Sequence, residues 1–222
     1  MRDERKQYKY ISKEFLEEHE KANQLNREMF WDLVGDDLTG KTILDLCCGD
    51  GYDLVHYQSL GATCFGLDQC KDFVNVARKR LPAIEIVECL AEKAPFADEI
   101  FDCIFSKYAI MTAADMNPIF KQAHRMLKRG GTFLYLVTHP MRQFEEKCDP
   151  YADYEKQVVV ESSILNGKMS VYEPSHTEEE YFTDDFLSKF RLVQRRSAHD
   201  PAAAQIGTRK YPGFLILKWI KI

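Results

Sequence analysis

The sequence predicts a doubly wound α/β fold, in which helices cover both faces of a mostly parallel sheet. Five short apolar runs follow one another after residue 40, with stretches of helical character between them. Most of these runs are apolar at nearly every position, which is typical of parallel strands that are buried on both sides. Right-handed crossovers between such strands produce a doubly wound sheet.

The predicted elements follow in order along the chain. Residues 1–40 carry apolar residues at helical spacing, and Gly40 follows as a stop signal. The predicted strands are TILDLCC at 42–48, TCFGLD at 63–68, AIEIVECL at 83–90, FDCIFSKY at 101–108 and TFLYLVTH at 132–139. The predicted helices between them cover 53–60, 71–80 and 116–128.

The alternation of strands and helices ends after residue 139. QVVVESSIL and KMSVYEP flank Asn166-Gly167, a dipeptide typical of a two-residue hairpin turn. Thr177 and Glu180 have the spacing of a capping box for a helix within 177–190, and two final strands are predicted at 190–197 and 213–222. We expect one domain over 1–222, made of an N-terminal helical lid (1–40), a cofactor-binding core (41–139), an inserted hairpin cap (140–182), and a last helix with a C-terminal strand pair (183–222).

Charge and cysteine content narrow the function classes. The formal net charge is −5, whereas proteins that bind nucleic acids or anionic membranes usually carry a basic excess. No stretch is long and apolar enough for a membrane span, and the charged start MRDERKQYKY is unlike a signal peptide. The seven cysteines form no C-x-x-C pair and no zinc-ligand spacing with histidine. We expect free thiols in a reducing cytoplasm and no metal site.

The segment ILDLCCGDGYD at 43–53 contains the strongest functional signal. A buried strand runs into a tight turn with Gly49 and Gly51, and a helix follows. Glycines let the backbone pass close to a ligand, and the helix N-terminus favours a negative group. Asp45 lies inside the apolar strand, where a carboxylate is costly unless it is paired. A cationic amine or a hydrogen-bonded backbone turn would be a suitable partner.

Asp68 ends the second predicted strand, 23 positions after Asp45. A carboxylate at this place can accept both ribose hydroxyls of an adenosine, and about 20 residues is the usual spacing for that role. A dinucleotide fingerprint would need a third glycine at position 54, where the chain has Leu54. The pattern therefore favours a nucleoside cofactor other than NAD.

With these motifs the chain resembles the class I S-adenosylmethionine-dependent methyltransferases, in particular the type 11 small-molecule group, from about residue 10 to the end. ILDLCCGDG looks like the family's first motif and GLDQC like its ribose-binding second motif. The segments at 91–110 and 124–137 are similar to the motifs that follow. The resemblance implies a Rossmann-like seven-stranded sheet, S-adenosylmethionine as the methyl donor and S-adenosylhomocysteine as the product.

The resemblance also implies which residues hold the cofactor. Asp45 and Gly49 would hold the methionine end, Asp68 the ribose, and residues 91–92 the adenine. Residues 106–108 would run under the sulfonium. The implied set is Tyr10, Asp45, Cys47, Cys48, Gly49, Gly51, Asp68, Gln69, Ala91, Glu92, Ser106, Lys107 and Tyr108.

Cys47, Leu90 and the two N-terminal tyrosines carry further expectations. Cys47 stands where the family commonly has glycine, in a Cys-Cys-Gly version that looks like some quinone-pathway members. Leu90 stands where an acidic residue often bonds adenine, so cofactor affinity is weakened or the contact shifts to Glu92. The N-terminal helix of relatives closes over the cofactor, which makes Tyr8 or Tyr10 a candidate lid contact.

Methyl transfer from a sulfonium is an in-line displacement, so the protein mainly aligns the acceptor, the methyl carbon and the sulfur. An oxygen or nitrogen acceptor can also require removal of a proton. His139, at the end of the fifth predicted strand, and His176, after the hairpin, are the candidate catalytic bases. For each histidine, the alternative is a structural hydrogen bond.

The acceptor is narrowed by motifs that the chain lacks. Residues 106–109 read Ser-Lys-Tyr-Ala, where relatives that methylate amino groups of bases carry an Asn/Asp-Pro-Pro-aromatic turn. We expect methyl transfer to an O, N or C atom of a small-molecule acceptor, without a nucleic-acid partner. Two alternatives stay open: a methyltransferase that acts on protein or nucleic acid, and a non-catalytic S-adenosylmethionine-binding regulatory protein. The sequence indicates neither the acceptor nor the oligomeric state.

Overall fold

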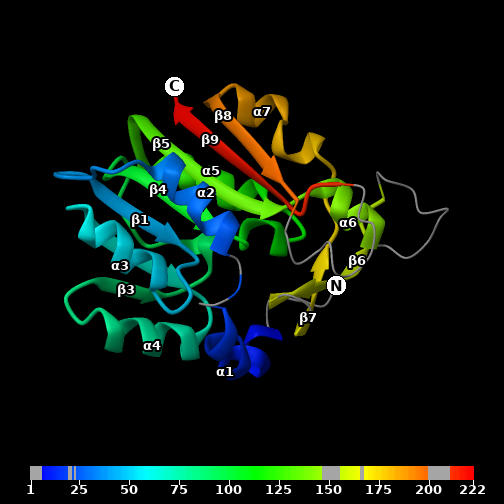
Figure 1. The fold of residues 1–222 in the computed structure, drawn as a ribbon. Coiled ribbons are helices and arrows are strands. Elements are labelled where there is room, and N and C mark those ends of the chain that lie inside the picture. Colours follow the sequence, from blue (N-terminus) through cyan, green and yellow to red (C-terminus); the bar gives the residue numbers. More distant parts are fainter. Residues whose placement is uncertain (1–6, 20–21, 23, 147–155, 166–167, 200–210) are drawn as a thin grey trace.

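The computed structural model describes residues 7–19, 22, 24–146, 156–165, 168–199 and 211–222, to which all structural statements refer. A seven-stranded sheet forms its centre (Figure 1). Its strands are β1 (Thr42–Leu46), β2 (Thr63–Asp68), β3 (Glu85–Glu88), β4 (Phe101–Lys107), β5 (Leu127–Thr138), β8 (Phe190–Ala198) and β9 (Phe214–Lys221).

The strand order is β3-β2-β1-β4-β5-β9-β8. The first five strands are parallel, whereas β9 is antiparallel to both β5 and β8. The chain winds outward from β1 in one direction to β3 and then from β4 in the other. The order therefore reverses between β1 and β4, and doubly wound sheets bind ligands at the carboxyl ends of the strands beside such a reversal.

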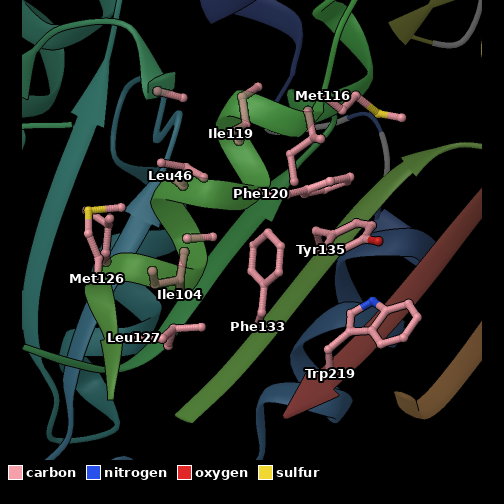
Figure 2. Close-up of a cluster of buried hydrophobic side chains, with 14 of the residues drawn as sticks. Leu46, Ile104, Met116, Ile119, Phe120, Met126, Leu127, Phe133, Tyr135 and Trp219 are labelled. Carbon is pink, nitrogen blue, oxygen red and sulfur yellow. The ribbon is translucent and has the colours of Figure 1, made fainter. Parts of the chain in front are cut away.

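Helices cover both faces of the sheet, as the sequence predicts. The described helices are α1 (Tyr8–Glu18), α2 (Gln24–Val34), α3 (Tyr52–Ser59), α4 (Lys71–Arg80), α5 (Asn117–Met126), α6 (Pro140–Glu146) and α7 (Asp184–Leu187). Helix α1 packs against α4, and α6 packs against the strand at Val159–Ile164. One buried cluster joins α5 and α7 to one face, where Phe120 lies near Phe133, Tyr135 and Trp219 (Figure 2). A second cluster packs α2, α3 and α4 on the other face, around Phe30 and Phe105.

The cap is a two-stranded antiparallel sheet of β6 (Val159–Ile164) and β7 (Met169–Pro174), which lies apart from the main sheet (Figure 1). Both predicted hairpin strands are confirmed. The predicted turn residues Asn166 and Gly167 lie outside the described residues. A small buried cluster of Ala22, Leu165 and Met169 links this hairpin to the N-terminal segment.

Three differences from the sequence prediction are larger than one or two residues at an element end and have a visible cause. The N-terminal region forms two helices, because the chain interrupts the helical pattern between Glu18 and Gln24. β5 begins at Leu127, because residues 99–101 pair with residues 125–127 before a bulge shifts the register to Cys103 opposite Thr132. The region 177–190 forms only a 3-10 turn at Glu179–Tyr181 and the single-turn helix α7.

Candidate functional site

A cavity of about 220 Å³ opens where β1, β2 and β4 end. Its floor consists of the strand ends and of the turn that follows β1. Helices α1 and α2 and the cap hairpin supply the remaining walls. Because this is the carboxyl edge of the parallel sheet, the cavity lies where doubly wound folds bind their ligands.

The turn after β1 holds an unusual backbone conformation. Cys47, with φ 64°, and Gly49, with φ 55°, are both left-handed, which is costly for Cys47 because it carries a Cβ. Tyr108, at the end of the neighbouring β4, also has positive φ, at 50°. A Cβ on Gly49 would meet no protein atom within 4 Å. The turn therefore leaves open space for a ligand directly above the sheet edge.

Asp68 connects this turn to the end of β2. Its carboxylate accepts hydrogen bonds from the backbone N–H of Gly49 at 3.0 Å and of Cys70 at 2.8 Å. Burial raises the pKa of Asp68 to about 6, although these backbone donors act in the opposite direction. The side chain is 7% exposed and lines the cavity, so its position is fixed before any ligand arrives.

Asp45 is the least compensated carboxylate of the cavity. It is 5% exposed, and no hydrogen bond reaches its side chain from the part of the chain that the structure describes. Burial raises the pKa of Asp45 well above its usual value, with Asp53 adding repulsion and Lys107 acting against both. A buried carboxylate that faces a cavity in this way is suited to a cationic ligand group.

Lys107 supplies the nearest compensating charge. Its ammonium donates to both carboxylate oxygens of Asp53, at 2.7 and 2.6 Å. The indole N–H of Trp31 donates to the same carboxylate at 2.8 Å. These contacts tie α2, α3 and the end of β4 together beside Asp45.

Helix α1 covers the cavity through an aromatic surface. Phe15 lies 5.5 Å from Phe73 of α4 and stacks on His19 at 5.1 Å, measured between ring centroids. His19 contacts the Asp50 carboxylate at 3.2 Å, and Arg80 contacts it at 2.8 Å. Burial opposes ionisation of Asp50, but His19 and Arg80 outweigh it and lower the pKa of that carboxyl. Helix α1 is thus anchored on the turn that forms the cavity floor.

The chain is similar in sequence to known methyltransferases. A family model for a methyltransferase domain matches residues 44–135, which run from β1 into β5. An uncharacterized methyltransferase of Synechocystis is 37% identical over 102 residues, covering 45% of this chain and 48% of that protein. The demethylmenaquinone methyltransferase of Lactococcus lactis is 33% identical over 113 residues, covering 47% and 45% respectively. The chain thus matches about half the length of these curated relatives.

A solved structure from Listeria monocytogenes, assigned to the S-adenosylmethionine-dependent methyltransferases, superimposes with a TM-score of 0.73. The match covers 88% of this chain and 97% of that one. The sequence identity is 20%, so the match shows a shared fold. The family model and the shared fold agree. Residues 44–135 thus match a methyltransferase domain, and the chain shares the fold of solved S-adenosylmethionine-dependent methyltransferases.

In this chain, most of the predicted cofactor residues line one cavity. They are Asp45, Cys47, Cys48, Gly49, Asp68, Gln69, Lys107 and Tyr108. Tyr10 lies outside the lining and is 82% exposed, whereas Tyr8, on another side of α1, lines the cavity. The helical period explains the difference, because residues two apart point in different directions.

Four further predicted residues lie outside the lining. Ser106 is fully buried, and its hydroxyl donates to the carbonyl of Leu46 at 2.8 Å. Gly51 caps α3 with φ 77°, and a Cβ there would approach Leu81 to 3.1 Å. Ala91 and Glu92 form a 3-10 turn after β3. Their roles as cofactor contacts remain predictions.

The two predicted catalytic histidines also lie outside the cavity lining. Nδ1 of His139 accepts from the backbone N–H of Met141 at 3.2 Å and so caps α6. Burial lowers the pKa of His139. His176 places one ring nitrogen 2.7 Å from Glu180 and the other 3.0 Å from the carbonyl of Met111. Both ring nitrogens of His176 thus face protein acceptors, and the catalytic roles of His139 and His176 stay predictions.

The structure adds polar lining residues that the sequence did not indicate. They are Asn26, Arg27, Thr138, Arg142, Ser162 and Glu173. Glu173 lies on β7 in register with the buried Met169 and Val171, so a carboxylate at an apolar position of the alternating strand was the available signal. Arg142 lies on α6, a helix that the sequence prediction did not contain; Pro140 at its first position was the available signal.

The residues that the structure describes lack two kinds of feature. No helix in these segments has the length and apolar character needed to cross a membrane. Within the same segments, no three His, Cys, Asp or Glu side chains are grouped as metal ligands would be.

Proposed function

We propose that this chain binds S-adenosylmethionine in the cavity and transfers its methyl group to an O, N or C atom of a small-molecule acceptor. The observation that carries the proposal is Asp45, a buried carboxylate beside the open glycine turn, which no described residue hydrogen-bonds. S-adenosylmethionine carries two positive centres, an ammonium and a sulfonium. Either charge would compensate a carboxylate that the protein itself leaves poorly paired.

The other lining residues fit the same cofactor. Asp68 would accept the ribose hydroxyls, since its carboxylate is held at the strand end by two backbone N–H groups and retains lone pairs. The space above Gly49 would take the methionine end. Bound S-adenosylmethionine supplies an activated methyl group with a neutral thioether as leaving group. The chain then contributes alignment and exclusion of water, because α1 and the hairpin cover the cavity.

A small acceptor is supported by the cap. The hairpin wall brings Ile164, Leu165 and Val171 to the lining, so the acceptor end of the cavity is partly apolar and enclosed. The Lactococcus relative is named for a small-molecule acceptor, demethylmenaquinone. The net charge of −5 argues against a nucleic-acid acceptor.

Thermal unfolding tests this proposal without knowledge of the acceptor. S-adenosylmethionine and S-adenosylhomocysteine, at about 100 times their dissociation constants, should each stabilise by roughly 2.7 kcal/mol and raise Tm by a few degrees. NAD at the same concentration should leave Tm unchanged. With Asp45→Asn, we expect an unchanged or higher Tm without ligand, and a smaller shift with S-adenosylmethionine.

A shift of the same size with NAD would contradict the proposed cofactor. No shift with either adenosyl ligand would favour a scaffold that has lost cofactor binding.

A further inference from the structure

The cap end of the cavity contains a carboxylate that neither the cofactor motifs nor the candidate histidines include. Glu173 of β7 is 2% exposed and lines the cavity. Its Oε1 accepts a hydrogen bond from the Ser162 hydroxyl of β6 and another from the Gln143 amide of α6, each at 3.0 Å. Two elements of the cap thus hold this carboxylate in place.

The orientation of Gln143 is fixed by its neighbours. Its Oε1 accepts the backbone N–H of His176 at 3.1 Å, so its NH2 group must be the one that faces Glu173. The same NH2 group donates to the carbonyl of Pro174 at 3.2 Å. His176 in turn is fixed by its contacts with Glu180 and with Met111, which lines the cavity. The backbone N–H of His176 is therefore part of the support of Glu173.

Glu173 and Asp68 line the same cavity, Asp68 from the end of β2 and Glu173 from β7 of the cap. Tyr8 of α1 lines the cavity with them, where burial raises the pKa of its hydroxyl and the charges of Glu173 and Asp68 raise it further. The cavity thus has one buried carboxylate from the sheet edge and another from the cap. Ile164, Leu165 and Val171 of the cap hairpin add apolar side chains to the lining.

We propose that Glu173 is the catalytic base, which faces the transferred methyl group and receives the proton of the acceptor. This inference rests on the proposed function. The acceptor is then a hydroxyl or amine compound whose apolar body lies against the hairpin. Its lone pair forms the new bond to the methyl carbon while the C–S bond breaks and its electron pair stays on sulfur. The O–H or N–H proton passes to the Glu173 carboxylate.

Sinefungin provides a probe that requires no acceptor. In this analogue a carbon that bears an ammonium group replaces the methylsulfonium centre, so a cation stands where the transferred methyl group would be. S-adenosylhomocysteine lacks any group at that position. A charge-assisted hydrogen bond to the ammonium is worth about 1.5–3 kcal/mol, or roughly 10- to 150-fold in affinity. The two ligands therefore separate the contribution of Glu173 from that of the shared nucleoside.

Calorimetric titrations of both ligands into the full chain test the proposal. Glu173→Gln should weaken sinefungin binding at least tenfold and change S-adenosylhomocysteine binding less than twofold. Unchanged S-adenosylhomocysteine binding also shows that the variant is folded. The matched control is Glu161→Gln, an exposed residue of the same hairpin, which should alter neither affinity.

Three results would overturn the proposal. An equal effect of Glu173→Gln on both ligands, or no effect on either, would mean that Glu173 does not face the transferred group. Methylation of an acceptor at undiminished rate by Glu173→Gln would exclude proton transfer to this side chain. Failure of both ligands to bind the wild-type chain would instead remove the proposed function itself.

Discussion

The carboxylates around the cavity differ in how the protein compensates them. Asp50 is paired with the His19 ring and the Arg80 guanidinium, and Asp53 with an ammonium and an indole N–H. Asp68 has backbone donors, and Asp45 lacks a hydrogen bond within the described residues. Asp45, the carboxylate with the fewest protein partners, therefore marks the position that we propose for a cationic group of the ligand. A bound cation would compensate this carboxylate as protein donors compensate the other three.

The sequence predicted Asp45 and Asp68, which lie where we propose that the cofactor binds. It did not lead us to Glu173, which lies where we propose that the acceptor binds. Asp45 is conspicuous because it interrupts an apolar strand, and Asp68 because it ends one. Glu173 also stands at an apolar position, in register with Met169 and Val171, but the short strand gives a weaker contrast. The contact of His176 with Met111 could not be predicted, because the two residues lie 65 positions apart and meet only when the chain folds.

The raised pKa of Asp68 predicts how cofactor binding depends on pH. Ribose hydroxyls donate to an ionised carboxylate, so affinity for S-adenosylhomocysteine should be constant above about pH 7. Below the folded pKa of about 6, the dissociation constant should rise up to about tenfold per pH unit. Titrations between pH 5 and 8 measure this, and Asp68→Asn should flatten the profile at a weaker affinity.

The free energy of unfolding of the free protein should change with pH in the direction opposite to cofactor affinity. Because burial raises the pKa of Asp68 above its unfolded value of 3.8, the folded state binds the proton more tightly between pH 3.8 and about 6. The ionised carboxylate therefore destabilises the free protein above pH 6, and this cost is lost as the pH falls through that window. An affinity that rises on acidification would contradict the assignment.

At the scale of elements, α1 and the cap hairpin form one cover over the cavity. The side-chain amide of Gln7 bonds the backbone of Tyr172 twice, at 2.6 and 2.8 Å, and Lys168 of the hairpin pairs with Glu18. Ile11 and Phe15 pack against the small cluster beneath. The sequence predicted a lid and a cap separately. The contact between them is made by side chains about 150 positions apart in the chain. Hydrophobic periodicity describes single elements and so cannot predict such a contact.

Phe15→Ala tests this cover. The variant loses the ring contacts of Phe15 with Phe73 and His19 but leaves the central sheet intact. We expect S-adenosylhomocysteine to bind about tenfold more weakly, because the cofactor would no longer be sealed from water. Tm should fall by only a few degrees, since the lid belongs to the least stable part of the fold. Calorimetry and thermal unfolding give the two values.

Glu14→Ala, an exposed substitution on the same helix, serves as the control and should change neither value. A large loss of Tm together with unchanged affinity would show that α1 stabilises the core and does not form a lid.

At the scale of the whole molecule, the sheet and the cavity position follow from one pattern. β2 was predicted with its observed bounds, because its ends coincide with a glycine turn and a polar helix start. The insertion of β9 between β5 and β8 was not predicted, since strand order depends on long-range pairing such as Thr138 opposite Phe214. Even so, the reversal between β1 and β4 is enough to place the ligand.

The central claim is that this edge of the sheet binds an adenosyl cofactor. Calorimetric titration of S-adenosylhomocysteine into the wild-type chain and Asp68→Ala at pH 7.5 tests it most directly. We predict saturable binding at one site per chain in the wild type. Asp68→Ala should bind at least tenfold more weakly, because two hydrogen bonds to an ionised carboxylate are lost. Absence of binding by the wild type, or equal affinity of both proteins, would contradict the account.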